Sequence, residues 1–185
     1  MKSVLISIQP KWCELIASGK KTIEVRKTKP KLETPFKVYI YCTKPRHFYK
    51  ISKHLLTSDE SLFLVNDKVK MCDGFGVEYE DRNYKHLNCK VIGEFVCDEI
   101  YDCRDVNMDD TCITVEEWLK YTKGHKGVVY GWHISNLVIY DKPRELSEFR
   151  SYNVRAFMDD NGYPMPTHKI TRPFQSWGYV YEIDT

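Results

Sequence analysis

The stretch IQPKWCELIASGKKTIEVRK, from Ile8 to Lys27, decides the fold because it joins a helix, a stop signal and the start of a strand. Pro10 fits the first turn of a helix, where its missing N–H has no partner to lose. The apolar residues that follow have the i, i+3, i+4 spacing of one buried helical face: Trp12, Leu15 and Ile16. Gly19 ends this helix, because glycine adopts the left-handed conformation after a helix at little cost.

After the glycine the hydrophobic period changes from that of a helix to that of a strand. If Ile23 and Val25 face the core, Glu24 and Arg26 share the opposite face, roughly 6.5–7 Å apart along the strand. Lys21 lies just before them. A carboxylate between two cations stays ionised, and the cations keep a surplus positive charge that can bind an anion. The alternative is a solvated strand face with ordinary ion pairs, and spacing alone does not separate the two.

Gly19, Lys21, Glu24 and Arg26 form a G-x-K-x-x-E-x-R pattern, and on these residues the chain resembles the ASCH domain family. The resemblance implies an α+β fold similar to that of PUA domains, a small closed β-barrel with flanking short helices. It also implies a cleft lined by these charged residues, which the family associates with RNA or nucleoside ligands. We expect a single domain over residues 1–185, with a loop or helix insertion at roughly 45–85.

The composition is that of an ordinary soluble globule, with 42% hydrophobic and 29% charged residues. No apolar run reaches the eighteen or so residues that span a bilayer, and Ser7 and Pro10 interrupt the first one. We therefore expect a cytoplasmic protein. The seven cysteines include no C-x-x-C pair, so we expect reduced thiols. The Cys and His spacings match no common zinc site, and we expect neither a metal nor a cofactor.

Charge is unevenly distributed along the chain, whose net charge is only +2. The first fifty residues contain twelve Lys or Arg and three Glu. Such segregation makes a local positive field possible, and phosphate is a common partner of such a field. The extended segment 27–35, with three lysines and two prolines, is a candidate for a basic rim beside the cleft, or a solvated connector.

Alternating apolar residues predict further strands, at 36–42, 90–100, 128–134, 137–140 and a final strand through Trp177. Gly93 fits a bulge or bend in the second of these. Thr114 and Glu117 form a capping box, so we expect a structural helix over 115–122. We expect the aromatic stripe of the last strand to be buried.

The first functional hypothesis is a binding module for RNA or a nucleotide-like ligand. Arg26 would bind phosphate or a base edge, Lys21 would act as a point charge, and Glu24 would accept a bond from a base or hold Arg26. An exposed aromatic ring, with Trp12 or Trp132 as the leading candidate, could stack on a base. The candidate ligand-binding residues are Gly19, Lys20, Lys21, Glu24, Arg26, Lys27, Lys29, Trp12, Trp132 and Arg172.

The second hypothesis is an enzyme in which Lys21 and Glu24 are catalytic. Some ASCH-like proteins are amidohydrolases of acetylated cytidine, and the resemblance places Lys21 at the position of their lysine. Glu24 stands where those enzymes carry threonine, so the expected nucleophile is absent. Other relatives resemble ribonucleases, for which acid–base chemistry and cationic stabilisation would suffice. A protein-interaction domain with a vestigial cleft is a third possibility, and the sequence does not identify a protein partner.

Overall fold

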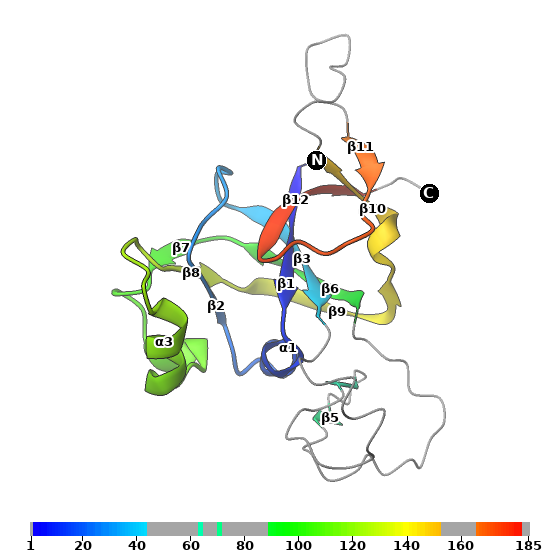
Figure 1. The fold of residues 1–185 in the computed structure, drawn as a ribbon. Helices are drawn as coiled ribbons and strands as arrows, with labels where there is room; N and C mark the ends of the chain where they lie inside the picture. The colour runs from blue at the N-terminus through cyan, green and yellow to red at the C-terminus, as the bar shows by residue number, and fades with distance from the viewer. Residues whose placement is uncertain (1, 44–62, 65–69, 72–88, 153–165, 183–185) are drawn as a thin grey trace.

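The computed structural model of this chain describes residues 2–43, 63–64, 70–71, 89–152 and 166–182 (Figure 1). These residues form mainly strands, with two α-helices. The helices are α1 (Pro10–Ala17) and α3 (Val115–Thr122), and short 3-10 helices cover Met108–Thr111 and Leu146–Glu148. The strands are β1 (Ser3–Ile8), β2 (Ile23–Arg26), β3 (Phe36–Cys42), β4 (Phe63–Leu64), β5 (Lys70–Met71), β6 (Lys90–Cys97), β7 (Ile100–Asp102), β8 (Tyr130–His133), β9 (Ser135–Arg144), β10 (Phe149–Tyr152), β11 (Pro166–Lys169) and β12 (Trp177–Glu182).

The strands pair into a large sheet of order β11-β10-β12-β1-β3-β6-β9, a smaller sheet β2-β8-β7, and the pair β4-β5. All pairs in the large sheet are antiparallel except β1 with β3. Across the described part of the chain these pairings do not close into a ring. The closed barrel expected from the resemblance is therefore not confirmed. The expected combination of β-sheet and short helices is confirmed.

The central strands of the large sheet are buried on both faces, which explains their nearly continuous apolar sequence. Along β1, Val4, Ile6 and Ile8 pack into one core cluster, with Trp132 and Phe95. Leu5 points to the other face and packs in a second cluster. Each of these six side chains is at most 1% exposed. The two clusters hold the sheet between them, so β1 gives the site a rigid base.

Parallel pairing requires the chain to cross over between β1 and β3, because parallel strands cannot be joined by a tight turn. Residues 9–35 form this crossover, and they contain α1 and β2. Figure 1 shows α1 at one end of β1, and α3 next to β2. The motif of Gly19, Lys21, Glu24 and Arg26 therefore lies on the crossover between β1 and β3, which their parallel pairing requires.

The predicted elements agree closely with the observed ones in the described residues. The strand at 36–42 and the helix at 115–122 are observed with those bounds, and the capping box of Thr114 and Glu117 is present. The predicted strand at 90–100 is divided into β6 and β7. The predicted insertion at 45–85 lies outside the described residues except for β4 and β5.

Three expectations concern cysteines, metals and membranes. The six cysteines that the structure describes carry free thiols, as expected. In the described residues, no three metal-ligating side chains come together. Nor does any described helix combine the length and the apolarity needed to cross a bilayer.

Gly93 lies where β6 bends, as predicted. The register of β6 shifts between Val91 and Gly93 against both β3 and β9. A Cβ atom at residue 93 would lie 2.4 Å from the backbone oxygen of Val138 and 3.1 Å from a methyl group of Ile139. Because the closer atom belongs to the backbone, a larger residue requires the two strands to separate.

We predict that Gly93→Ala lowers the free energy of unfolding by about 2–3 kcal/mol, because overpacking of a dense interior forces the backbone to move. The measurement is urea unfolding followed by circular dichroism. Gly127→Ala is the matched control, since an added Cβ there meets only the ring of His125, at 3.2 Å, which can move aside. A Gly93→Ala protein as stable as this control would show that β6 and β9 do not approach as closely as described.

Candidate functional site

The end of α1 places Lys21 at the site. Gly19 has a φ of +72°, the left-handed conformation predicted from the sequence. Its N–H donates to the carbonyl of Ile16 at 2.9 Å, and the N–H of Lys21 donates to the carbonyl of Leu15 at 2.9 Å. These bonds satisfy carbonyls at the end of the helix and turn the chain into β2. Gly19 therefore contributes to the site through its backbone conformation, which ends the helix and directs Lys21 towards the site.

Lys21 is a buried cation whose side chain is only 1% exposed. Its ammonium group donates to the backbone oxygen of Thr111 at 2.6 Å and lies 3.5 Å from Oε2 of Glu24. It also lies 5.2 Å from the centre of the Trp12 ring. A buried charge is tolerated when it is paired and hydrogen-bonded, and both conditions are met here.

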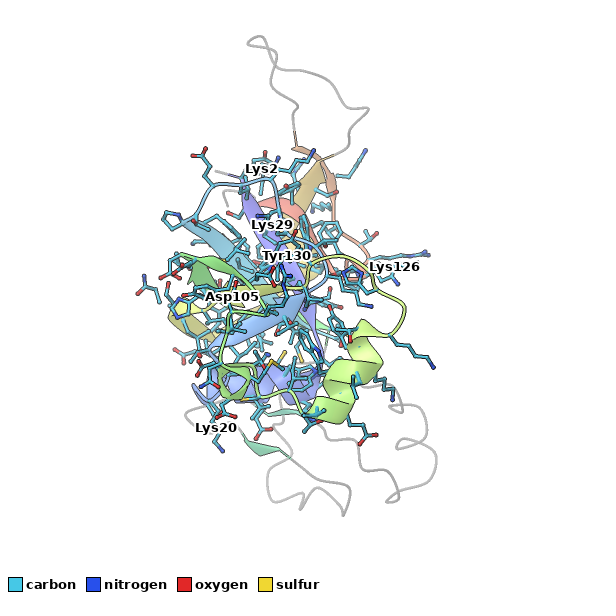
Figure 2. All side chains as sticks on the ribbon, turned by 90° about the vertical axis from the view of Figure 1, so that its left-hand side faces the viewer. Lys2, Lys20, Lys29, Asp105, Lys126 and Tyr130 are labelled. Atoms are coloured by element: carbon cyan, nitrogen blue, oxygen red, sulfur yellow. The ribbon has the colours of Figure 1, made fainter. Side chains whose placement is uncertain are left out.

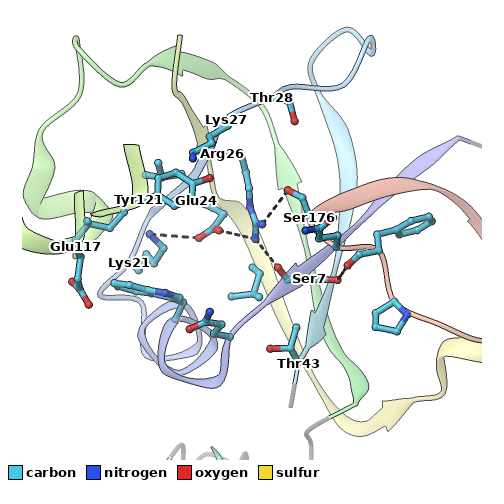
Figure 3. A pocket seen from close by; sticks show the side chains of 18 residues that line it. Ser7, Lys21, Glu24, Arg26, Lys27, Thr28, Thr43, Glu117, Tyr121 and Ser176 are labelled. Atoms are coloured by element: carbon cyan, nitrogen blue, oxygen red, sulfur yellow. Dashed lines mark hydrogen bonds and ion pairs between the residues drawn. The ribbon is translucent and has the colours of Figure 1, made fainter. Parts of the chain in front are cut away.

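Glu24 is the anion that joins Lys21 to Arg26. Its side chain is 7% exposed, and Oε1 lies 2.9 Å from Nη2 of Arg26 (Figure 3). Arg26 also donates through Nη2 to the carbonyl oxygen of Ser7 at 2.8 Å, and through Nη1 to the hydroxyl of Ser176 at 3.3 Å. Its Nε atom is buried and has no hydrogen-bond partner among the described residues.

The strand that carries these charges is covered on both sides. Ile23 and Val25 are buried as predicted, but Glu24 is buried as well, with only 6% of the residue exposed. The alternative of a solvated strand face with ordinary ion pairs is therefore wrong. We name Lys21, Glu24 and Arg26 the charged triplet.

A cleft of about 820 Å³ lies beside the charged triplet. It is bounded by the end of β1, α1, β2 with the residues after it, α3, and the segment before β12 (Figure 3). Its lining side chains are Ser7, Ile8, Gln9, Trp12, Lys21, Glu24, Val25, Arg26, Lys27, Thr28, Thr43, Ile113, Glu117, Tyr121, Pro173, Phe174, Gln175 and Ser176.

Helix α3 forms one wall of this cleft through Glu117 and Tyr121. Glu117 accepts bonds from Thr114 within the capping box, and forms an ion pair with Lys11 of α1 at 2.5 Å. Burial raises the pKa of Glu117, but the bonds from Lys11 and Thr114 outweigh burial and lower it below its usual value. Burial also raises the pKa of Tyr121, against the effect of Arg26. Glu117 therefore stays ionised, and Tyr121 keeps its hydroxyl proton at neutral pH.

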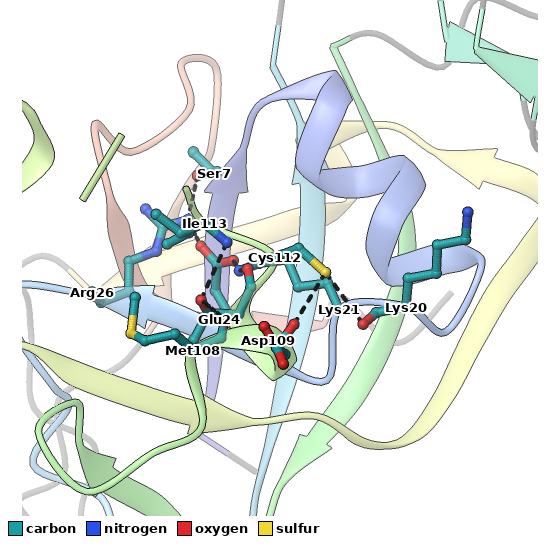
Figure 4. Close-up of polar contacts among 10 residues, drawn as sticks. Ser7, Lys20, Lys21, Glu24, Arg26, Met108, Asp109, Cys112 and Ile113 are labelled. Carbon is teal, nitrogen blue, oxygen red and sulfur yellow. Dashed lines mark hydrogen bonds and ion pairs between the residues drawn. The ribbon is translucent and has the colours of Figure 1, made fainter. Parts of the chain in front are cut away.

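The structure brings together half of the predicted ligand-binding residues. Those that line the cleft are Trp12, Lys21, Glu24, Arg26 and Lys27. Gly19, Lys20, Lys29 and Arg172 do not line it. Figure 4 shows the side chain of Lys20 turned away from the charged triplet, and Lys20, Lys29 and Arg172 are all exposed.

The expectation that Trp132 offers an exposed ring for stacking is wrong. Its side chain is completely buried, and its ring packs edge-on against Phe36 and Trp177, with centroids 6.0 Å and 5.8 Å away. Trp132 is buried because it lies on β8, the middle strand of the small sheet between β2 and β7, and because its side chain belongs to the main core cluster.

Several site residues were missed because they come from distant parts of the sequence. Ser7 and Ser176 hold Arg26, and the carbonyl of Thr111 holds Lys21. Helix α3 was expected to be structural, yet it supplies Glu117 and Tyr121 to the cleft. The capping box marked Glu117, but no sequence pattern placed it opposite α1.

The charges of the cleft leave a positive surplus. Lys21, Arg26 and Lys27 face it together with the carboxylates of Glu24 and Glu117. Since Glu117 is already paired with Lys11, Glu24 alone balances the three cations. The cleft is therefore suited to an anion or to a ligand that carries one.

The sequence matches the family model of the ASCH domain over residues 6–152. The fold is similar to the crystal structure of a point mutant of the ASCH protein from Zymomonas mobilis, with a TM-score of 0.50 and 16% identity over 79% of this chain and 77% of that chain. The crystal structure of ASCH from Zymomonas mobilis itself gives a TM-score of 0.49 and 17% identity over 78% and 73%. No curated protein matches this sequence. At these identities the likeness to solved structures shows the fold alone.

We predict that Glu24→Gln lowers the free energy of unfolding by about 3 kcal/mol, because it leaves two buried cations without their anion. Urea unfolding at neutral pH measures the loss. Glu33→Gln removes the same charge from an exposed position of the 27–35 segment and serves as the control. Equal stability of the two variants would mean that Glu24 does not balance Lys21 and Arg26.

Proposed function

Because this chain belongs to the ASCH domain family, we propose that its cleft binds one nucleotide unit, either free or as part of an RNA strand. The observation that carries the proposal is the charged triplet, buried at the base of a cleft with surplus positive charge. The family is often linked to RNA binding. A volume of about 820 Å³ is also within the range of small-molecule sites.

The two cations of the triplet have different roles in this proposal. Arg26 is held in one orientation by Glu24, Ser7 and Ser176, so its guanidinium is positioned before a ligand arrives. Lys21 has one strong bond, to Thr111, and a longer contact to Glu24. Since an ammonium group has three donors, Lys21 retains capacity to bind a phosphate or carbonyl oxygen in the cleft.

Two aromatic rings of the cleft, those of Trp12 and Tyr121, are paired with lysines. Lys11 lies 4.5 Å from the centre of the Trp12 ring, and Lys27 lies 4.9 Å from that of Tyr121. Cation–aromatic contacts of this kind hold ammonium groups in place while their charge is retained. We therefore propose that the rings of Trp12 and Tyr121 serve mainly to hold the lysine ammonium groups in position.

We predict that Lys21→Met weakens binding of a uridine or adenosine monophosphate about tenfold or more, because a charge-assisted bond in a water-poor site is lost. Isothermal titration calorimetry measures the affinity. The neighbouring Lys20→Met is the matched control, since it removes the same charge from an exposed side chain that does not line the cleft.

Two outcomes would contradict this assignment. Equal affinities of the Lys21→Met and Lys20→Met proteins would show that Lys21 does not contribute to nucleotide binding. If the unmodified protein binds neither a nucleotide nor single-stranded RNA at low salt, the proposed function itself fails.

Hydrolysis of a modified nucleoside or of RNA is a second candidate function, favoured by the burial of Lys21 beside Glu24. An ammonium group and a carboxylate 3.5 Å apart, at the base of a cleft, can exchange a proton with a bound substrate. The threonine of the related amidohydrolases is absent from the motif. Thr28 and Thr43 line the cleft, but from other parts of the chain.

If the protein is an amidohydrolase, it will release acetate from an acetylated cytidine, and both Lys21→Met and Glu24→Gln will abolish release while Lys20→Met keeps it. Acetate is measured enzymatically, and circular dichroism confirms that each variant is folded. An absence of turnover with acetylated nucleosides and with RNA, despite nucleotide binding, would exclude the catalytic function and leave the binding function.

A further inference from the structure

The cleft continues onto the segment that leaves β2. Lys27 and Thr28 line the cleft, and the chain then runs on through Lys29, Pro30 and Lys31. Lys29 and Lys31 are exposed, whereas Pro30 between them is buried. Lysines therefore recur at every second residue of this segment, at 27, 29 and 31. We name these three residues the lysine track.

The segment is fixed to the body of the protein by the last strand. The indole N–H of Trp177 donates to the hydroxyl of Thr28 at 2.9 Å, and the backbone N–H of Lys31 donates to the hydroxyl of Tyr179 at 2.7 Å. Both aromatic rings pack against the main core. The lysine track is therefore held in one conformation, which lowers the entropic cost of binding.

The charges of the lysine track are not neutralised within the described residues, where none of the three lysines forms an ion pair with a carboxylate. Lys29 lies over the ring of Tyr130, 5.2 Å from its centre, just as Lys27 lies over Tyr121. Figure 2 shows Lys29 and Tyr130 together, far from Lys20 at the other end of this view. An aromatic ring positions an ammonium group without cancelling its charge, which leaves the group available to a phosphate.

From these observations we infer that the ligand is single-stranded RNA, and that nucleotides flanking the one in the cleft place their phosphates on the lysine track. This inference rests on the proposed function of the cleft. The lysine track leads away from the cleft, because Lys27 lines the cleft whereas Lys29 and Lys31 do not. Single-strand-binding proteins combine such a basic path with a local binding site. A free nucleotide would not reach beyond Lys27.

The test compares Lys29→Gln/Lys31→Gln with the unmodified protein for two ligands, uridine monophosphate and a single-stranded oligouridylate of about ten nucleotides. We expect about tenfold weaker binding of the oligonucleotide, a salt dependence whose slope is smaller by about 1.4, and unchanged binding of the mononucleotide. Fluorescence anisotropy between about 50 mM and 200 mM salt gives the slope. Lys126→Gln/Lys142→Gln removes two exposed lysines elsewhere and is expected to keep oligonucleotide affinity and slope.

Unchanged oligonucleotide affinity in the Lys29→Gln/Lys31→Gln protein would show that the lysine track does not bind flanking phosphates. The proposal for the cleft would not be affected. An equal loss in the control protein would also contradict the role of the lysine track, because net charge rather than position would then explain the effect. If the unmodified protein binds mononucleotide and oligonucleotide equally well, flanking phosphates make no contact and the inference fails. A protein that binds neither ligand disproves the function of the cleft itself.

Discussion

The structure of the site depends on one buried carboxylate. Glu24 lies between Lys21 and Arg26, in a place where either cation alone would be costly to bury. The carboxylate allows both cations to approach each other and to face one cleft. Arg26 then bonds to β1 through the carbonyl of Ser7, which connects the small sheet to the large one. The charged triplet therefore organises both the charge of the cleft and, through the hydrogen bond from Arg26 to Ser7, the contact between the sheets.

The position of this carboxylate follows from the topology of the large sheet. Because β1 and β3 are parallel, the chain must cross over between them, and the crossover contains the helix, the turn and the strand of the motif. Burial of β1 on both faces makes the base of the cleft rigid. The function that we propose uses this rigidity, since donors already in position lose little entropy when a ligand binds.

Sequence patterns predicted the parts of the site that are local. The period change after Gly19 and the spacing of Lys21, Glu24 and Arg26 were enough to predict three charges on one wall of a pocket. The opposite walls were not predictable, because Glu117 and Ser176 reach the cleft through pairings between distant segments. Trp132 was misjudged for the same reason: its exposure depends on strands that precede it by about a hundred residues and lie against it. Local periodicity describes one element, whereas burial on a second face is decided by the elements that cover it.

One wall of the cleft is formed by residues close to the last strand. The backbone N–H of Ser7 bonds to the carbonyl of Ser176 at 2.8 Å, and its hydroxyl bonds to the carbonyl of Phe174 at 2.6 Å. These contacts join positions separated by almost the whole described chain. During synthesis on the ribosome, the motif emerges early but lacks this wall until the segment around Ser176 has also emerged. The cleft can therefore be completed only after the segment around Ser176 has been synthesised and has bonded to Ser7.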